Sequence, residues 1–400
     1  MKEPIIALDF GGSHLKLVIG YVLDHRPFVL YAAQAPLHQA IVHGQIEDRE
    51  QVMATLKELL VTTEKNTGLK IEKVIFALPA FGLQVFDSLK ETSTVANDDT
   101  VKRNDITNLL GMMRKEIIDI NSQIVAIVPE IYTIVDNGFQ YDVPPLGEKA
   151  NAIRLHAKVH TLSKQVVDDY ESILEEVGLK LEKHFIDQYV LGRLLEIDPE
   201  APKKFLLVDI GHDITHVSFF AHKQIYSSPF FRMGGVDLTK QISEHFAITP
   251  SQAQELKRLY GYDTRVLTFK PPIFKVEDEA GKTTAYKLDD FRRVVKEELE
   301  KFYAELSASL SLIEQEQANF DEIRTLPIIL TGGGSALAGL SEFLREKLPT
   351  RTFKPWVFNC LGARDPAFGI CLGLIKVYDE YVTTIVDERT YVPPVTREAR

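Results

Sequence analysis

Two apolar strands that each end in an Asp-x-Gly turn, half a chain apart, constrain the fold of this chain more than any other feature. The first is Ile5–Leu8, followed by Asp9 and two glycines, and the second is Phe205–Val208, followed by Asp209 and Gly211. A short continuous apolar run is typical of a strand that is buried on both faces. Glycine lets backbone N–H groups approach an anion closely, because no Cβ stands in the way. The pair therefore predicts a duplicated α/β fold that grips a phosphate between its halves.

The first turn supplies candidate ligands of two kinds. Gly11, Gly12, Ser13 and Lys16 offer backbone N–H groups, a hydroxyl and a cation to a phosphate. Asp9 would repel a phosphate directly, so its expected role is to hold a hydrated Mg²⁺ that bridges to the phosphates. Taken alone, a Gly-Gly pair after a strand is also what an ordinary hairpin turn contains.

A third glycine-rich turn favours a nucleotide site over a simple hairpin. Leu326–Leu330 is an apolar run, and Thr331 leads from it into Gly332, Gly333, Gly334 and Ser335. The segment 341–348 after this turn is predicted to be helical. Glycines between a buried strand and a helix let backbone amides approach a base, a ribose or a phosphate, whereas the alternative is a flexible loop with no ligand.

These motifs resemble the actin-like ATPase superfamily, and within it the FtsA family of bacterial cell-division proteins. The Asp9 turn resembles the first phosphate loop of the superfamily, the Asp209 turn resembles its second, and the Gly332 turn resembles its adenosine loop. The resemblance covers nearly the whole chain. Its further segments are His43–Asp48, Tyr132–Asp136, Val143–Gly147, Met233–Thr239, Ala253–Gly261 and Gly362–Phe368.

The resemblance implies that ATP and Mg²⁺ bind between the two halves. The implied cofactor-binding residues are Asp9, Gly11, Gly12, Ser13, Lys16, Asp209, Gly211, Thr215, Gly234, Gly235, Gln254, Lys257, Gly332, Gly333, Gly334 and Ser335. The implied metal-binding residues are Asp9, Asp209 and Asp213.

The second turn departs from the family pattern. His212 and Asp213 stand where small residues are usual, His216 replaces a closing acid, and Gln254 replaces the Glu that usually contacts the ribose. A carboxylate ~4 Å from a phosphate costs several kcal/mol at an effective dielectric of ~20, unless a metal ion lies between them. Asp213 is therefore expected either to turn away or to join the metal ligands. We expect nucleotide binding with slow or absent hydrolysis, because no residue is identified that positions the attacking water. The alternative for the two histidines is that they are solvated turn residues.

The predicted fold class is α/β, a duplicated ribonuclease-H-like (actin-like ATPase) fold with two inserted subdomains. The first unit is predicted from strands at 15–22, 28–33 and 74–78 and from a helix at 50–60. The expected divisions are 1–85 for the first lobe (1A), 86–161 for an inserted α+β subdomain (1C), 162–200 for a return to the first lobe, 201–246 for the second lobe (2A), 247–319 for the second inserted subdomain (2B), 320–385 for the second lobe and a closing helix, and 386–400 for a polar tail.

The insertions have their own predicted elements. The first contains a helix at 105–118 flanked by strands. The second contains strands near Leu267 and Phe274 and a long charged helix from Asp289 to Glu316.

Composition excludes some classes of protein. A net charge of -11 argues against a nucleic-acid groove and against unspecific binding to an anionic bilayer. Two cysteines are too few for a disulfide framework and fit a reducing compartment. No secretory signal or membrane-spanning segment is evident, so the expected location is the cytoplasm.

The place of the first insertion favours an adaptor over an enzyme. FtsA and the pilus protein PilM carry an extra subdomain at the place that 86–161 occupies here, and both act as adaptors at the inner face of the cytoplasmic membrane. The resemblance therefore implies an ATP-binding cytoskeletal adaptor of bacterial cell division, which polymerises into filaments and links FtsZ to the membrane-associated divisome. The alternatives are a PilM-like adaptor of type IV pilus assembly, which would bind a pilus-protein peptide, and an ATP-dependent small-molecule kinase.

Partner contacts are expected on the second insertion and through the tail. Phe291–Arg293 and Lys301 offer positive charge to the acidic C-terminal peptide of FtsZ. The FtsA family usually ends in an amphipathic membrane-binding helix, but 386–400 is polar and contains two prolines. Direct membrane anchoring is therefore not expected from this tail: the alternatives are an anchor that is truncated, one that is replaced by a partner through which the protein associates peripherally, and no anchor at all.

Overall fold

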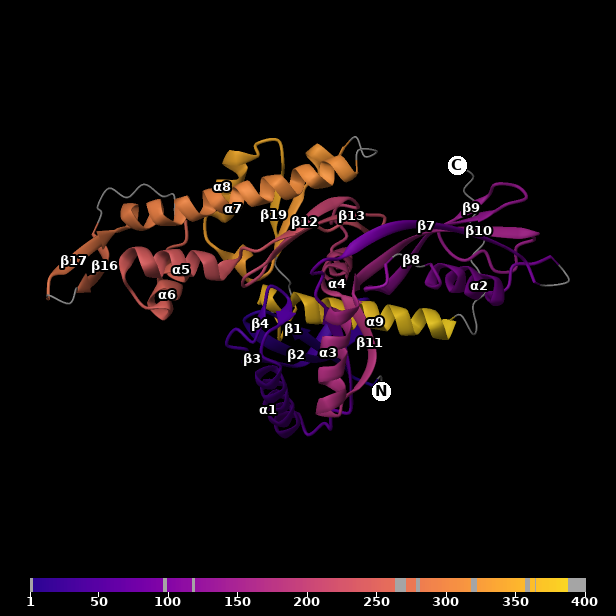
Figure 1. Ribbon diagram of the computed structural model, residues 1–400, viewed down its shortest axis with the longest axis horizontal. Helices are drawn as coiled ribbons and strands as arrows, with labels where there is room; N and C mark the ends of the chain where they lie inside the picture. Colours follow the sequence, from indigo (N-terminus) through magenta and orange to yellow (C-terminus); the bar gives the residue numbers. More distant parts are fainter. Residues whose placement is uncertain are drawn as a thin grey trace.

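The molecule is built around two sheets that share one strand order and one set of strand directions (Figure 1). The computed structural model describes residues 3–95, 99–116, 119–262, 271–277, 281–317, 322–356, 360–363 and 365–387. The first sheet has the order β3-β2-β1-β6-β11, and the second has the order β14-β13-β12-β18-β19. In each sheet the strand that leads into the Asp turn pairs antiparallel with the following strand and parallel with a later one. The predicted duplicated α/β fold is therefore confirmed.

Most strands of the two sheets overlap predicted apolar runs, whereas β11 and β19 were not predicted. The first sheet contains β1 (Ile5–Phe10), β2 (His14–Leu23), β3 (Arg26–Pro36), β6 (Lys73–Leu78) and β11 (Lys180–Ile186). The second contains β12 (Phe205–Ile210), β13 (Thr215–Ala221), β14 (Gln224–Ser227), β18 (Ile328–Thr331) and β19 (Phe353–Pro355), and β15 (Phe230–Phe231) pairs with β13. A small hairpin of β4 (Ile41–Val42) and β5 (Gln45–Ile46) follows β3.

The pairing register is the same around both Asp turns. Asp9 lies opposite Lys16 in the β1–β2 pair, and Asp209 lies opposite His216 in the β12–β13 pair. The duplication therefore places Asp9 and Asp209 at equivalent positions, and it places His216 where the first lobe has a lysine.

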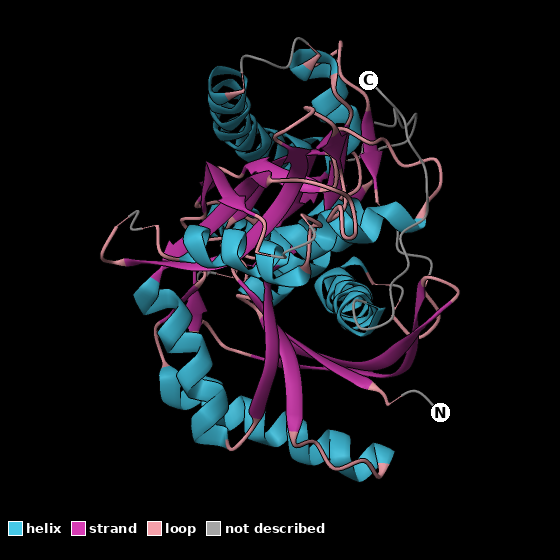
Figure 2. Ribbon diagram, turned by 90° about the vertical axis from the view of Figure 1, so that its right-hand side faces the viewer, coloured by secondary structure: helices cyan, strands magenta, loops and turns pink. Residues whose placement is uncertain are grey.

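Helices pack alongside the strands of both lobes (Figure 2). They include α1 (Arg49–Thr67), α3 (Lys164–Val177), α4 (Asp187–Leu194), α8 (Leu340–Lys347) and α9 (Gly369–Asp387), with short 3₁₀ helices at Leu195–Ile197, Ile323–Thr325, Gly333–Ala336 and Pro366–Phe368. Local sequence sets the ends of α1. The Asp48 side chain accepts a hydrogen bond from the Gln51 N–H at the start, and Gly68 ends the helix in the left-handed conformation with φ 71°. None of the helices in the described part of the chain is long and apolar enough to cross a membrane.

The first inserted segment forms a sheet of its own. Its strands are antiparallel, in the order β7-β10-β8-β9, and α2 packs against β7, β8 and β10. The elements are β7 (Gln84–Ser93), α2 (Arg103–Arg114), β8 (Ser122–Ile134), β9 (Gln140–Tyr141) and β10 (Ala152–Ser163). Helix α2 thus ends before the predicted limit at 118, and residues 117–118 lie outside the described residues.

The second inserted segment lies at the opposite end of the long axis from the four-stranded sheet (Figure 1). The predicted segment 247–319 contains α6 (Pro250–Tyr260), the hairpin of β16 (Pro272–Glu277) and β17 (Thr283–Lys287), and the long helix α7 (Leu288–Glu316). Helix α5 (Gly235–Phe246) directly precedes it. The strand predicted near Leu267 lies outside the described residues, as do 388–400 of the predicted polar tail.

The first inserted sheet also contacts the second lobe. The Gln224 side chain donates a hydrogen bond of 2.8 Å to the Pro129 carbonyl, and the Tyr226 hydroxyl donates to the Glu130 carboxylate. The Lys158 ammonium lies 4.4 Å from the centre of the Tyr226 ring. These contacts join β8 and β10 to β14, and we call them the β14 bridge.

Helix α9 returns to the first lobe. Its Cys371, Leu374 and Ile375 are buried against Ala7 and Val18 of the first sheet. Helix α9, the closing helix expected within 320–385, therefore packs with the first lobe. Both cysteines of the chain, Cys360 and Cys371, are free thiols.

Gly373 is the position at which α9 touches α4, and its substitution tests this contact. A Cβ on Gly373 would stand 2.7 Å from the carbonyl carbon of Val190, which is backbone and cannot rotate away. We expect Gly373→Ala to lower the free energy of unfolding by about 1–3 kcal/mol through overpacking, measured by urea denaturation followed by circular dichroism. Gly111→Ala in α2 is the control, because a Cβ there meets nothing within 4 Å and the change raises helix propensity. Equal effects of the two substitutions would contradict the close packing.

Candidate nucleotide-binding site

Three glycine turns converge between the lobes. We call them the first turn (Gly11–Ser13), the second turn (Gly211–Ile214) and the third turn (Gly332–Ser335). The first two close in the same way, because the Gly11 N–H donates to the His14 carbonyl at 3.2 Å and the Gly211 N–H donates to the Ile214 carbonyl at 2.9 Å. The structure thus brings together turns that are far apart in the sequence.

Glycine is needed where the turns touch. A Cβ on Gly12 would stand 2.8 Å from Asp213 Oδ1 of the second turn. Gly332 has φ 78°, and a Cβ there would collide with Asp209 Oδ1 and Ile210. The third turn continues as a short 3₁₀ helix, and α8 begins only at Leu340. The helix predicted at 341–348 is therefore confirmed to within one residue at each end.

A polar cluster lies beneath the turns, at the carboxyl ends of β1 and β12. It consists of Asp9, Lys16, Asp187, Gln188 and Asp209. Lys16 Nζ donates to Asp9 Oδ2 at 2.8 Å, and Gln188 Nε2 donates to Asp209 Oδ2 at 2.9 Å. The Asp187 carboxylate accepts the N–H of Ala80 at 3.0 Å, from the loop that follows β6.

The cluster contains more negative than positive groups. Burial raises the pKa of Asp209 to about 6, with a further contribution from Asp9. Burial also raises the pKa of Asp187 well above its ordinary value, and the nearby Asp209 adds to this effect. Burial alone would lower the pKa of Lys16, but the Asp9 carboxylate outweighs it and the pKa is raised. The cluster contains three carboxyl groups and one ammonium group. A divalent cation would therefore balance its charge and find oxygen ligands in it.

A second group of side chains joins α5 to α6. Lys257 Nζ donates to the Gly235 carbonyl and to the Thr239 hydroxyl, both at 2.7 Å, and the Thr239 hydroxyl donates to Gln254 Oε1 at 2.8 Å. Burial, with a smaller contribution from Arg258, lowers the pKa of Lys257 to about 8. Gln254 and Lys257 thus lie beside the start of α5, where the Gly235 N–H donates to the Gly211 carbonyl.

Two of the predicted residues serve the protein's own packing. Thr215 is fully buried, and its hydroxyl donates to the Met233 carbonyl at 2.7 Å. Gly234 packs against the second turn, where a Cβ would stand 2.7 Å from the Asp213 N. Ser335, in contrast, is half-buried in the third turn and donates to the Gly332 carbonyl at 2.7 Å.

The histidines of the second strand pair differ in exposure. His216 is buried, its Nε2 has no hydrogen-bond partner, and burial lowers its pKa to about 4. The alternative of a solvated turn residue is therefore wrong for His216, which is neutral at neutral pH. His212 is half-buried, and burial lowers its pKa as well. His14 of the first lobe also has a lowered pKa, first through burial and then through Lys16 and His212.

Asp213 is held by the first lobe. Its Oδ2 accepts the backbone N–H of His43 at 2.7 Å, and its carbonyl lies 2.8 Å from His43 Nδ1. His43 stands in the turn between β4 and β5. This contact joins the two lobes beside the first turn.

Sequence reasoning missed Asp187 and Gln188. Both are buried at the start of α4, where they complete the polar cluster. The available signal was weak, since it consists only of two polar residues inside the otherwise apolar run from Phe185 to Leu191.

The predicted peptide contact on α7 needs correction. Phe291 is fully buried and cannot reach a peptide. The positive residues each lie near an acid one turn away, since Arg292 is 3.3 Å from Asp289 and Lys301 is 2.7 Å from Glu298. Arg293 has the same arrangement with an acid at 4.0 Å.

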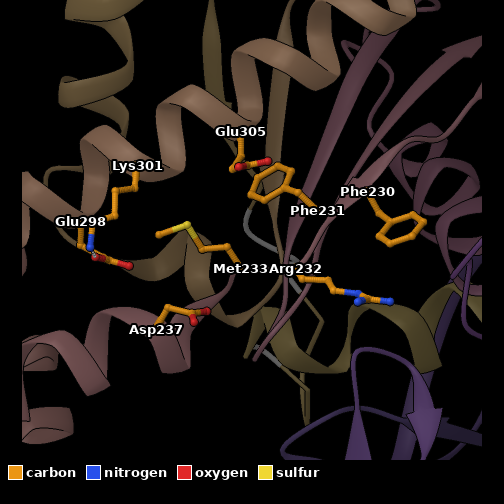
Figure 3. A pocket seen from close by; sticks show the side chains of 8 residues that line it. All are labelled: Phe230, Phe231, Arg232, Met233, Asp237, Glu298, Lys301 and Glu305. Atoms are coloured by element: carbon orange, nitrogen blue, oxygen red, sulfur yellow. Dashed lines mark hydrogen bonds and ion pairs between the residues drawn. The ribbon is translucent and has the colours of Figure 1, made fainter.

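A cavity of about 580 Å³ lies between α7 and the start of α5 (Figure 3). Its lining residues are Phe230, Phe231, Arg232, Met233, Asp237, Glu298, Lys301 and Glu305. The Lys301 ammonium lies beside Glu298, whereas the Arg232 side chain points away from both (Figure 3). Lys301 therefore remains the basic group of α7 that faces this cavity.

Comparison with known proteins finds similarity to bacterial cell division proteins. A family model described as "Cell division protein FtsA" matches residues 206–373. The cell division protein FtsA of Enterococcus hirae is 24% identical over 374 residues, which cover 92% of this chain and 82% of that protein. FtsA of Bacillus subtilis strain 168 is 21% identical over 393 residues, which cover 94% and 83%.

Solved structures share the fold at low sequence identity. A PilM-PilN type IV pilus biogenesis complex matches with a TM-score of 0.62 at 18% identity, over 94% of this chain and 98% of that chain. MreB5 of Spiroplasma citri bound to ADP matches with a TM-score of 0.59 at 13% identity, over 96% and 99%.

The duplicated sheets, the three facing turns and these neighbours define the class as the actin-like ATPase fold. Within that class, the sequence is similar to the bacterial cell division protein FtsA, whose family model matches residues 206–373.

The raised pKa of Asp209 predicts a pH limit for metal-assisted nucleotide binding. A carboxyl group that is protonated below pH of about 6 no longer serves as an anionic metal ligand. We expect the gain in ATP affinity that Mg²⁺ provides to shrink as the pH falls below about 6, measured by titration calorimetry from pH 5 to 8. Asp209→Asn is the control, because Mg²⁺ should increase the ATP affinity of this variant only slightly. The pH dependence of that small increase should reflect only the titration of the nucleotide. A wild-type gain that persists unchanged at pH 5 would contradict the assignment.

Proposed function

We propose that this protein is an ATP-binding cytoskeletal adaptor of bacterial cell division, which works in the manner of FtsA. The observation that carries the proposal is the set of facing turns above a buried acidic cluster, in a chain whose sequence relatives are cell division proteins. In this proposal, the nucleotide holds the lobes together. Binding at a thousandfold excess over Kd would stabilise the closed form by ~4 kcal/mol.

The residues of the site fit ATP and Mg²⁺. We assign the metal to Asp9 and Asp209 of the polar cluster, and the phosphates to the first and second turns with Lys16. When bound, Mg²⁺ supplies positive charge that offsets the phosphates and the buried carboxylates. Lys16 needs to exchange its contact with Asp9 for one with a phosphate, which a metal ion on Asp9 would favour.

The same residues support slow or absent hydrolysis. His216 is neutral and its buried Nε2 has no partner, so burial opposes its taking up a proton. Asp213 is tied to His43 and is not free to orient a water molecule. The site therefore suits a clamp that keeps its nucleotide, rather than an enzyme with rapid turnover.

We propose that the adaptor self-associates into filaments and binds the C-terminal peptide of FtsZ at the inner face of the cytoplasmic membrane. The cavity beside Lys301 supports a peptide contact, because it combines Phe231 and Met233 with polar groups from two helices. Membrane association through partners completes this proposal.

A PilM-like role in pilus assembly is the second candidate. The observation that favours it is the structural match to the PilM-PilN complex, which extends over nearly the whole of both chains. In that case the peptide partner would be a pilus protein and not FtsZ. A small-molecule kinase remains a third candidate from the sequence, and the phosphate-release assay below tests it.

Nucleotide-dependent assembly is the first expected outcome. Purified protein with Mg-ATP should bind the nucleotide, release phosphate slowly or not at all, and sediment in a concentration-dependent way. Asp209→Ala should reduce both nucleotide binding and sedimentation, because it removes a proposed metal ligand. Sustained phosphate release that rises with a sugar or an acid as substrate would instead identify a kinase.

Peptide binding should depend on Lys301. We expect Lys301→Ala to weaken the binding of a fluorescent FtsZ C-terminal peptide by about threefold to tenfold, because the lysine lies at the cavity and the peptide is acidic. Lys296→Ala is the matched control, since Lys296 is exposed on the same helix but does not line the cavity. Binding of a pilus-protein peptide with no binding of the FtsZ peptide would support the PilM-like candidate.

A further inference from the structure

We propose that Asp213 makes this site selective for a nucleoside diphosphate over a triphosphate. The proposal rests on the proposed nucleotide-binding function and concerns the regulation of that same site. Asp213 would act as a specificity-determining residue, because its carboxylate already stands over the first anion-binding turn.

The position of the carboxylate carries the argument. Asp213 Oδ1 lies 2.8 Å from the place where a Cβ of Gly12 would stand, so it occupies the space that the missing side chain leaves open. Gly12 lies at the centre of the first turn, whose bare backbone is suited to accept an anion. An anion of the protein itself therefore faces this turn.

The carboxylate is also fixed in place. Its other oxygen, Oδ2, accepts the backbone N–H of His43 at 2.7 Å, and the Asp213 carbonyl lies 2.8 Å from His43 Nδ1. Only 7% of the residue is exposed. Swinging the carboxylate away from the turn would break the bond to His43 and bury a charge without a partner.

The resemblance of the third turn to an adenosine loop sets the direction of the nucleotide in this proposal. With the base and ribose against the third turn and α6, the phosphate chain runs toward the first and second turns, and its outermost phosphate approaches Gly12. A terminal phosphate at this place would meet the Asp213 carboxylate. Two negative charges in direct contact repel each other strongly in a medium of low dielectric constant. A diphosphate ends earlier and avoids most of this repulsion.

The nearby positive groups do not remove the repulsion. Without a metal ion on Asp9, Lys16 stays paired with that carboxylate at 2.8 Å. His212 and His14 have lowered pKa values, mainly because of burial, so both are largely neutral at neutral pH. A magnesium ion would screen the repulsion in part, which makes the preference strongest without the metal.

Titration calorimetry with ADP and ATP tests the proposal, each in EDTA and in Mg²⁺. In EDTA, we expect the wild-type protein to bind ADP at least about tenfold more tightly than ATP. Asp213→Asn keeps the size of the side chain and an oxygen for the His43 N–H, but removes the charge. It should raise ATP affinity by about tenfold and change ADP affinity by less than about threefold.

Asp168→Asn is the matched control, because it removes the same charge from an exposed position on α3. Its affinities for both nucleotides should equal those of the wild type, and thermal melting should show that both variants are folded. A lower ATP affinity in Asp213→Asn with Mg²⁺ would show that Asp213 is a metal ligand, and it would overturn the proposal. Unchanged ATP affinity in that variant would overturn it as well.

Failure of the proposed function gives a different result. If neither nucleotide binds to the wild type or to Asp213→Asn, the nucleotide site itself is refuted, and the inference falls with it. If ATP binds only after the substitution, the carboxylate is the barrier and the inference is supported.

Discussion

The enclosure of two equivalent carboxylates at the contact between the lobes is the constraint on which the rest of the structure depends. Asp9 is buried and Asp209 is partly buried at equivalent positions of the two sheets, and each needs a hydrogen-bond donor there. Lys16 serves the first from its own lobe, whereas Gln188 reaches Asp209 from the other half of the chain. The hydrogen-bond donor for Asp209 therefore comes from outside the second lobe. The closed arrangement of the lobes depends for this reason on the integrity of α4.

Local sequence signals were sufficient to predict the two central sheets and the glycine turns. Apolar runs that stop at Asp and Gly define β1 and β12 because strand burial and turn geometry both act on neighbouring residues. The cluster around these strands depends on contacts across long separations, such as Ala80 with Asp187, and a single sequence carries no mark of them. The same holds for the pairing of Asp213 with His43. Asp213 was expected either to turn away from the phosphate or to join the metal ligands, and neither expectation included a bond to the opposite lobe.

Two further differences between the sequence-based predictions and the structure have simple physical causes. His216 was open to interpretation as a solvated turn residue, but β13 lies between β12 and both β14 and β15, so the side chain is enclosed. The basic residues of α7 suggested a positive patch, yet Asp289 and Glu298 stand three residues from Arg292 and Lys301 on the same helix and compensate their charge. The sequence showed these acids, and the helical spacing would have revealed the pairing.

The β14 bridge gives the first inserted sheet a mechanical role. Gln224 and Tyr226 anchor this sheet to a strand of the lobe that carries the second turn, although the sheet itself is inserted in the other lobe. A hinge movement between the lobes must therefore either break these contacts or swing the whole four-stranded sheet. Since that sheet reaches one end of the long axis (Figure 1), a small rotation at the hinge becomes a large displacement at its tip.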